Sequence, residues 1–533
     1  MPIREIRGPY SRPFLMRSGA DYREALKRDG RNVWVLGVGP VEDVTEHPAT
    51  KPMVDEYVAW YDRHADPEWQ DILLTGPDAK GHRRPLAFEV PRSADDLRRL
   101  GRAVSAVHFT TGGNMTHTPG YGALIALGIL DAARSMNLRP AEIEAMTAYR
   151  DLIAETGRFL TFSSGGAPIG FRFREEEKER AALRVVRQTD AGVVVSGKVS
   201  MHTSVPYAED VFIAGGTQLD PDSELRSWFI VSVAAPGVRV VCRRPASRHE
   251  SRFVAPLSNR FDELDAQMWL EEVLVPWDRV ITSDSPGPNV SFSQPLASPE
   301  AARRRATGIA SWLFWHQHYG WLAKAEFTLG LGLALAEAMG LKENPATLEQ
   351  LVDLMVDVQT ARSCVTAAEL DPEVTQGGFL TPGQLHVASA SIYTLKARQR
   401  MSEILRSLPG SSMVVAPADS DFADEVIARN LEEAFGGGGF SAKQRAALLQ
   451  LAWDHVSSGL DGRESAFELH ANGGVPAWRQ RLRQLFDSYN DLANGVMRLI
   501  DIEMPAVDLS GLRLVAGTPR RQVTAEAAPK PAD

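Results

Sequence analysis

Cysteine is nearly absent from this sequence, which has 533 residues but only Cys242 and Cys364. The two lie far apart and form no CxxC pair, so neither a disulfide framework nor an iron–sulfur cluster is expected, and a reducing cytoplasm fits. Long hydrophobic runs are missing as well: none reaches the ~18 residues that span a membrane, and the first residues contain no apolar core of a secretory signal. We expect a cytoplasmic protein that is not inserted in a membrane.

An excess of basic residues is also missing. Lys and Arg number 58 against 68 Asp and Glu, which gives a net charge of -10. A nucleic-acid partner requires a basic face that neutralises phosphates, so this class of partner is not expected. No HExxH pattern is present, and the two histidines of WHQH, His316 and His318, fall on different faces of a helix. We therefore expect no metal site.

Two glycine-rich stretches are candidate cofactor loops. GLGLAL (330–335) has the spacing of a dinucleotide fingerprint, but the segment before it is typical of a helix, so a close helix–helix contact is favoured. FGGGGF (435–440) joins two expected helices. Its glycines would let a ligand approach the backbone, although a flexible linker is slightly favoured.

The spacing of apolar residues divides the chain into three zones. Residues 1–157 show helical spacing, and Ser93 with the acids after it marks one helix start. Residues 158–297 consist of short β-branched and aromatic runs broken by Gly, Pro and Asp, which predicts an antiparallel barrel or sandwich. Residues 298–515 are helical again and predict a bundle, whereas residues 516–533, rich in Ala and Pro, predict a disordered tail.

Two further stretches have no obvious role on composition alone. The string PLSNRFDELDAQMWLEEVLVPWDRV (256–280) carries charges that we interpret as architectural. Arg260 is expected to pair with Asp262 or Asp265 and to fix a domain junction. The stretch NMTHTPGY (114–121) connects two expected helices and would pass for an ordinary loop.

Together with VTEHPATKPMVDEYVAWYD, SADDLRR, TDAGVVVSGKVSMHTS and LLQLAWDHVSSGLDGRESAFEL, the 256–280 string resembles the oxygenase component of the 4-hydroxyphenylacetate 3-monooxygenase family. The similar segments follow the family order over most of the chain. The resemblance implies an α+β fold like that of the acyl-CoA dehydrogenases, with a helical N-terminal domain, an antiparallel β-barrel and a C-terminal four-helix bundle. It also implies a homotetramer, a dimer of dimers.

Members of this family receive reduced FAD from a separate NAD(P)H-flavin reductase. Oxygen adds at C4a of the flavin, and the resulting hydroperoxide transfers its distal oxygen to an electron-rich aromatic ring. The resemblance thus implies a monooxygenase that uses FADH2 and O2. The flavin performs the oxidation, while the protein positions the ring and excludes water.

The substrate side of the implied site departs from the family pattern. The family usually carries Arg-Thr-Pro-x-Tyr in its first catalytic loop, whereas this chain has HTPGY, so Tyr121 is kept and His117 replaces the arginine. Phe162 stands where the family has a histidine, and the resemblance implies that it contacts both substrate and flavin. Gly216 and Thr217 match a family stretch that lies near the substrate. Arginine is a fixed cation, but histidine can accept a phenol proton or donate one hydrogen bond. A less polar pocket is expected.

The flavin side departs less from the family. Thr203, in MHTS, matches a threonine that contacts the flavin, and two short segments match others that line it. By the resemblance, the cofactor-binding residues are Thr203, Phe162, Pro168, Ile169, Gly170, Phe171, Leu460, Asp461, Gly462 and Arg463.

The resulting hypothesis is a hydroxylase of an aromatic natural-product intermediate, with His117 and Tyr121 as the catalytic contacts. The ring could be a phenol, an indole-like group or a carrier-bound aryl group. Two alternatives stay open. One is another flavin-driven oxidation, such as the dehydrogenation of a thioester, on the same fold. The other is a protein that has lost catalysis and serves as a scaffold or flavin carrier.

Overall fold

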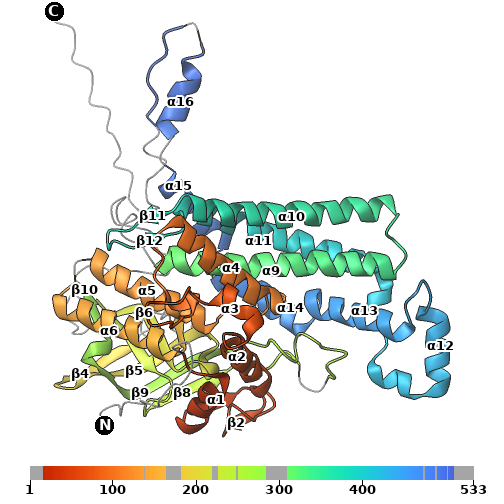
Figure 1. Ribbon diagram of the computed structural model, residues 1–533, viewed down its shortest axis with the longest axis horizontal. Helices are drawn as coiled ribbons and strands as arrows, with labels where there is room; N and C mark the ends of the chain where they lie inside the picture. Colours follow the sequence, from red (N-terminus) through yellow and green to blue (C-terminus); the bar gives the residue numbers. More distant parts are fainter. Residues whose placement is uncertain are drawn as a thin grey trace, which may run out of the picture.

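The structure is a computed structural model that describes residues 16–508, except residues 137, 164–181, 219–225, 248–249, 284–308, 472–473, 487–488 and 501. In the described part, an N-terminal group of helices and a β region lie against one side of a set of long C-terminal helices (Figure 1). The predicted tail, residues 516–533, falls outside the described residues.

The N-terminal helices begin where the sequence places their caps. Ser93 accepts a hydrogen bond from Asp96 N at the start of its helix, as predicted, and Ser18 forms a capping box with Asp21. Gly157 ends the last of these helices in a left-handed conformation (φ 66°), which glycine adopts without steric cost. The helices are α1 (Gly19–Arg28), α2 (Lys51–Arg63), α3 (Pro67–Leu73), α4 (Ala94–Thr110), α5 (Pro119–Ser135) and α6 (Pro140–Thr156).

The β region forms two sheets. The larger has six strands in the order β2-β1-β8-β9-β5-β4, and the smaller has four in the order β10-β7-β6-β3. The strands are β1 (Val33–Val35), β2 (Gly39–Val41), β3 (Leu160–Ser163), β4 (Arg184–Thr189), β5 (Gly192–Thr203), β6 (Asp210–Gln218), β7 (Arg226–Ser232), β8 (Val238–Cys242), β9 (Asp265–Pro276) and β10 (Val280–Ser283).

Two features of these sheets differ from the sequence prediction. β1 and β2 come from the N-terminal zone but join the larger sheet, and β1 pairs in parallel with β8. β3 likewise pairs in parallel with β6. Parallel pairing requires a long connection between partners, and a sequence pattern of short strands does not reveal which distant segments meet. The sheets are therefore largely, but not wholly, antiparallel.

Long helices make up the C-terminal part of the described chain. Three of them, α9, α10 and α11, run side by side, and α12 lies at their far end (Figure 1). The elements are α9 (Ile309–Ala338), α10 (Pro345–Leu370), β11 (Glu373–Val374), β12 (Leu380–Thr381), α11 (Gln384–Ser407), α12 (Glu425–Phe435), α13 (Ala442–Val456), α14 (Gly459–Ala471), α15 (Gly474–Leu485) and α16 (Tyr489–Met497).

Both glycine-rich stretches are structural. GLGLAL lies within α9, and a Cβ on Gly332 would stand 3.3 Å from side-chain atoms of Leu351 and Leu354 on α10, so the predicted helix–helix contact is confirmed. FGGGGF forms a tight turn between α12 and α13, in which Gly437 pairs with Phe440. Gly437, Gly438 and Gly439 all have positive φ, which explains the need for glycine there.

The helix α5 is buried on almost every side and connects the three zones. A Cβ on Gly122 would stand 2.3 Å from Leu160 O in β3, and one on Gly128 would stand 2.7 Å from Ile309 Cα in α9. Glycine therefore lets the backbones of sheet and bundle approach α5 from opposite sides. The N-terminal end of α5 carries the HTPGY loop, so this loop lies where the three zones meet.

An ion pair joins the β region to the N-terminal helices, but not the pair expected. Arg260 Nη2 lies 2.9 Å from Glu56 Oε1 in α2. Asp262 and Asp265 instead pair with Arg243. The predicted partners of Arg260 were wrong, because residues near one another in an irregular loop need not face one another. The predicted role at a junction is confirmed by the contact with Glu56.

Candidate active site

The HTPGY loop is held in one conformation by its own side chains. Thr118 caps α5 by accepting a hydrogen bond from Tyr121 N at 3.1 Å, and Pro119 occupies the first helical position. The hydroxyl of Tyr57, from α2, donates to the carbonyl of His117 at 2.9 Å. His117 and Tyr121 are both buried. The loop is therefore a rigid part of the core rather than a mobile connection.

The side chains of His117 and Tyr121 meet edge to face, with ring centroids 4.8 Å apart. Phe467, from α14, packs against His117 at 5.6 Å, and His316, from α9, packs against Tyr121 at 5.2 Å. Gln317 Nε2 lies 3.3 Å from the Tyr121 hydroxyl. Two elements that are distant in sequence, α9 and α14, thus converge on these two residues.

Burial controls the protonation of this cluster. It raises the pKa of Tyr121, although the hydrogen bond from Gln317 opposes the shift. Burial lowers the pKa of His108, which packs against His316 at 4.9 Å, to about 4. It also lowers the pKa of His316 well below its usual value. Near neutral pH the tyrosine is a phenol, and His108 and His316 are uncharged.

A carboxylate that the sequence analysis did not identify lies against the loop. Glu263 Oε1 accepts hydrogen bonds from Thr116 N and His117 N, both at 2.8 Å, and Glu263 Oε2 accepts one from Thr116 Oγ1 at 2.6 Å. Burial alone would raise the pKa of Glu263, but interactions with His117, Arg463 and Thr116 lower it overall. This fully buried side chain is therefore ionised.

A second buried network connects three of the predicted cofactor-binding positions. Arg463 donates to Asp265 at 2.7 and 2.8 Å, and Thr203 Oγ1 donates to the same carboxylate at 2.8 Å. The Arg463 Nη1 atom also lies 4.0 Å from Glu263 Oε2. Asp461 accepts hydrogen bonds from Arg398 and Arg406, both at 3.1 Å. The network links α14 to β5 and, through Glu263, to the HTPGY loop.

The other predicted positions are dispersed. Leu460 is buried against Leu257 and Phe261, and Gly462 is exposed on α14. Phe162 lies in β3 and packs against Phe212, in the neighbouring strand β6, at 6.2 Å. Gly216 and Thr217 lie in β6, and Thr217 pairs with Ser227. Pro168, Ile169, Gly170 and Phe171 fall outside the described residues.

Sequence reasoning missed Glu263, His108, His316 and Gln317 as members of the site. Glu263 was included in a string whose charges were all interpreted as architectural. His316 was considered only as a metal ligand, and on α9 it does face a different neighbour from His318, which contacts Val387 O at 3.1 Å. The available signal was the polar pair His316 and Gln317 in a largely apolar stretch of α9.

Metal binding and membrane insertion find no support in the described residues. No group of three or more His, Cys, Asp or Glu side chains in that part of the chain could hold a metal ion. Within the same residues, every helix is too short or too polar to cross a bilayer.

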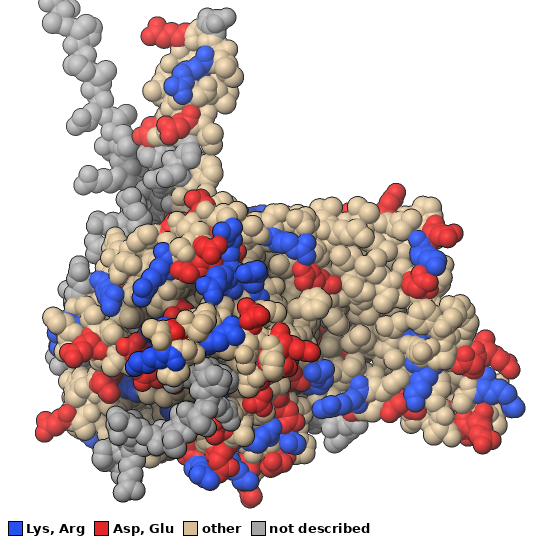
Figure 2. Space-filling model, viewed as in Figure 1, with Lys and Arg blue, Asp and Glu red and all other residues tan. Residues whose placement is uncertain are grey.

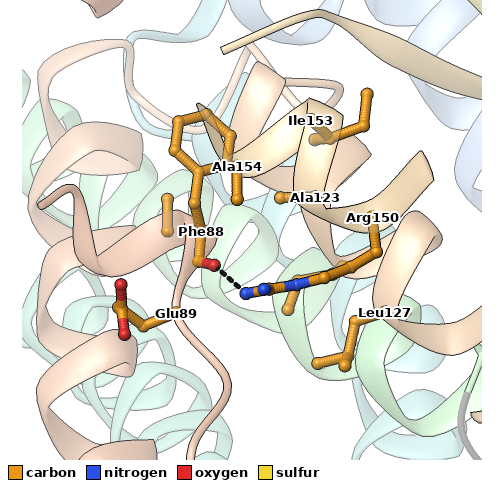
Figure 3. Close-up of a pocket in the computed structure, with 9 residues that line it drawn as sticks. Phe88, Glu89, Ala123, Leu127, Arg150, Ile153 and Ala154 are labelled. Atoms are coloured by element: carbon orange, nitrogen blue, oxygen red, sulfur yellow. Dashed lines mark hydrogen bonds between the residues drawn. The ribbon is translucent and has the colours of Figure 1, made fainter. Parts of the chain in front are cut away.

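A small pocket lies away from this cluster, between the segment before α4 and the helices α5 and α6 (Figure 3). Arg150 crosses its floor and donates to Phe88 O at 2.5 Å. The pocket has room for roughly one water molecule. It is too small for an aromatic ring, so it is not assigned a role in catalysis.

The order of helices, two β-sheets and long helices is the acyl-CoA-dehydrogenase-like arrangement that the resemblance implied, and comparison with known proteins places the chain in the class of flavin-dependent monooxygenases. Family models described as 4-hydroxyphenylacetate 3-hydroxylase N terminal and C terminal match residues 18–282 and 305–500. The chain belongs to the 4-hydroxyphenylacetate 3-hydroxylase family.

Individual relatives agree with this assignment. The 4-hydroxyphenylacetate 3-monooxygenase oxygenase component of Thermus thermophilus is 28% identical over 89% of this chain and 95% of its own. A monooxygenase of Streptomyces globisporus that acts on (3S)-3-amino-3-(3-chloro-4-hydroxyphenyl)propanoyl-[peptidyl-carrier protein SgcC2] is 28% identical over 91% and 92%. A crystal structure of the oxygenase component of 4-hydroxyphenylacetate 3-monooxygenase, complexed with FAD and 4-hydroxyphenylacetate, has a TM-score of 0.80 at 26% identity. It covers 91% of this chain and 98% of that one.

The residues at the expected cofactor position are compatible with FAD. Thr203 and Arg463 lie together at 3.4 Å, and no atom lies within 4 Å of the place where a Cβ would stand on Gly462. A ligand can therefore approach the α14 backbone beside these two polar side chains. The protein uses FAD in its reduced form together with O2, and a separate reductase supplies the reduced flavin.

Proposed function

We propose that the chain hydroxylates a phenol whose oxygen contacts His117 and Tyr121. The single observation that carries this proposal is the buried pair of rings, with centroids 4.8 Å apart, at the N-terminal end of α5. Both side chains can form a hydrogen bond to a phenolic oxygen. Reduced FAD, once bound, supplies the activated oxygen, while the protein holds the ring and excludes water.

The proposed substrate is an uncharged or weakly acidic aryl group from a natural-product pathway, either free or attached to a carrier. Histidine at position 117 provides no permanent cation, and Phe162 adds an apolar surface where the family has a histidine. A substrate with a free carboxylate is therefore less suited to this pocket than to a pocket with an arginine. The carrier-linked aryl substrate named for the Streptomyces globisporus relative fits the same reasoning.

The proposed cofactor site consists of Thr203, Phe162 and the 460–463 segment, in which Arg463 orients the threonine through Asp265. Pro168–Phe171 remains part of the proposal on sequence grounds alone. The proposed domain limits are 1–157, 158–297 and 298–515. The parallel pair of β1 and β8 extends the β unit into the first of these segments.

We also propose a homotetramer, in which a second copy covers α10. Along one face of this helix, Leu348, Val352, Met355 and Val356 are about half exposed. Few charged side chains lie over α9 and α10 at the upper right of Figure 2. Contiguous apolar surface of this kind usually marks an interface. We also propose a cytoplasmic location, because the two cysteines are far apart in the sequence.

Oxygen-isotope labelling tests the function directly. The protein is supplied with FAD, a flavin reductase, NADH and a panel of para-substituted phenols under 18O2, and the products are analysed by mass spectrometry. One 18O atom in a catechol product supports hydroxylation. Oxidation of NADH without labelled product for any aryl substrate would contradict the proposal.

A further inference from the structure

The carboxylate of Glu263 packs against the proposed substrate loop and is hydrogen-bonded to it. It is 0% exposed, and its oxygens accept two backbone N–H groups and one hydroxyl from consecutive residues. An ionised carboxylate accepts hydrogen bonds and donates none. The direction of every hydrogen bond that reaches Glu263 is therefore fixed.

The hydroxyl of Thr116 transmits this constraint to His117. Thr116 Oγ1 donates its single proton to Glu263 Oε2 at 2.6 Å, and it lies 2.9 Å from His117 Nδ1. Since the hydroxyl proton is already used, the contact with the ring requires a proton on Nδ1. A neutral imidazole with its proton on Nδ1 has an unprotonated Nε2.

We propose that Glu263 is a positioning residue, which acts through Thr116 to hold the proton of His117 on Nδ1 and so makes Nε2 the acceptor of the substrate's phenolic proton. This inference rests on the proposed phenol hydroxylation. Among the described residues, no hydrogen bond occupies Nε2, so the atom is available to a ligand.

The proton transfer conserves atoms and charge. The phenolic O–H bond breaks, an N–H bond forms at Nε2, and a phenolate and an imidazolium result. The imidazolium then faces Glu263 Oε2, 3.8 Å from Nδ1, so a buried positive charge is created beside a negative charge that is already in place. When the ring regains aromaticity after oxygen transfer, its C–H proton leaves to water and Nε2 returns the proton to the phenolic oxygen.

The other groups around His117 favour this direction. Tyr121 is held as a phenol and can donate to the substrate oxygen, while His108 and His316 are uncharged near neutral pH. Arg463, 4.0 Å from Glu263, is neutralised by Asp265 and Glu464. No uncompensated cation among these neighbours opposes formation of the imidazolium.

The fixed tautomer distinguishes His117 from the arginine that the family usually carries at this position. An arginine can only donate hydrogen bonds, so it suits a phenolate or a carboxylate that arrives charged. A histidine that is fixed as an acceptor instead takes up a neutral phenol and ionises it in place. Glu263 and Thr116 fix the tautomer of His117, so that its Nε2 atom can only accept a hydrogen bond.

The experiment uses 4-nitrophenol, whose phenolate is yellow, as a probe of the FAD-loaded protein without reductant. Difference spectra across pH give the pKa of the bound probe. The variants are T116V, which removes the relay hydroxyl but leaves the backbone bonds to Glu263, T116S, which restores the hydroxyl, and E263Q. Thr328→Val is the matched control, since that buried hydroxyl lies 2.8 Å from a different histidine, His455 Nε2.

In the wild type and in T116S and T328V, the bound probe should ionise at a lower pH than the free probe. In T116V and E263Q its ionisation should return toward that of the free probe. In turnover, kcat should fall on the order of 10²-fold in the same two variants, with the acidic limb of its pH profile displaced. Equal ionisation in wild type and T116V would overturn the role of Glu263. Failure of every protein to bind the probe would overturn phenol binding itself, and with it this inference.

Discussion

Arg463 and Asp265 form a bidentate ion pair, with N–O distances of 2.7 and 2.8 Å, that joins α14 to the first residue of β9. The Arg463 side chain is only 6% exposed. The pair lies between Thr203, at the proposed cofactor position, and Glu263, at the proposed substrate loop. It therefore connects the bundle and the β region at the point where chemistry is expected.

Asp265→Asn should weaken both folding and FAD binding. Removing one member of a buried pair leaves the other charge uncompensated, which costs on the order of 3 kcal/mol. Thr203 also loses the acceptor of its hydroxyl. Urea denaturation and flavin fluorescence titration measure the two effects. As a control, Glu337→Gln breaks the exposed pair with Lys342 and should change stability by less than about 1 kcal/mol.

His117→Ala should lower kcat on the order of 10²- to 10⁴-fold, because it removes the proposed proton acceptor. Tyr121→Phe keeps the ring and removes only the hydroxyl, so a smaller loss is expected, on the order of 10-fold, from one hydrogen bond. Product formation with saturating reduced FAD separates these effects from flavin supply. Full activity in both variants would show that neither side chain contacts the reacting oxygen.

Phe162→His should change substrate preference more than overall fold. Phe162 is partly buried in β3, so a polar ring there can reach solvent or substrate at a small cost in stability. A donor at this position should improve binding of phenols that carry a carboxylate and weaken binding of apolar aryl groups. The measurement is the ratio of kcat/KM for 4-hydroxyphenylacetate to that for its methyl ester. An unchanged ratio would place Phe162 outside the pocket.

The protein should lose stability in acid partly through Glu209. Burial on its own would raise the pKa of this carboxyl, but the charge and hydrogen bonds of Arg17 lower it to about 2, from an ordinary value of 4.5. Its stabilising contribution is complete above pH 4.5 and is lost as the pH falls toward 2, on the order of 3 kcal/mol in total.

Denaturation of the wild type and of E209Q at a series of pH values tests this expectation. The wild type should be the more stable at pH 7, and the difference should shrink as the pH falls below about 4.5. A difference that stays constant with pH would mean that Glu209 titrates normally in the folded protein.

Two glycines of α9 should respond in opposite ways to alanine. Gly330 is exposed with no atom near its virtual Cβ, so Gly330→Ala should stabilise the helix by about 1 kcal/mol. Gly332 lies against Leu351, Leu354 and Leu408, so alanine there loses this gain to crowding. Thermal unfolding of the two variants provides a direct comparison. Equal stabilisation by both would show that the α9–α10 contact is looser than the distances indicate.

The sequence predicted the helices well because caps and apolar spacing are local signals, as at Ser93. It did not predict that β1 joins the β region, because that pairing brings Val33 beside Val240. The same limit applies to the site. His117 and Tyr121 were found through one contiguous motif, whereas Glu263 is separated from His117 by 146 positions and is recognisable only once the chain is folded.

The middle of α5 and the loop at its N-terminal end differ in which substitutions they tolerate. Its middle is fixed between sheet and bundle by Gly122 and Gly128, where any larger residue would collide with backbone. Its leading end is anchored at residue 117 through the main chain, since Glu263 accepts the N–H of His117 and the Tyr57 hydroxyl donates to its carbonyl. Position 117 can therefore exchange one polar side chain for another without disturbing the scaffold. Selection for new aromatic compounds can act there at little cost to folding.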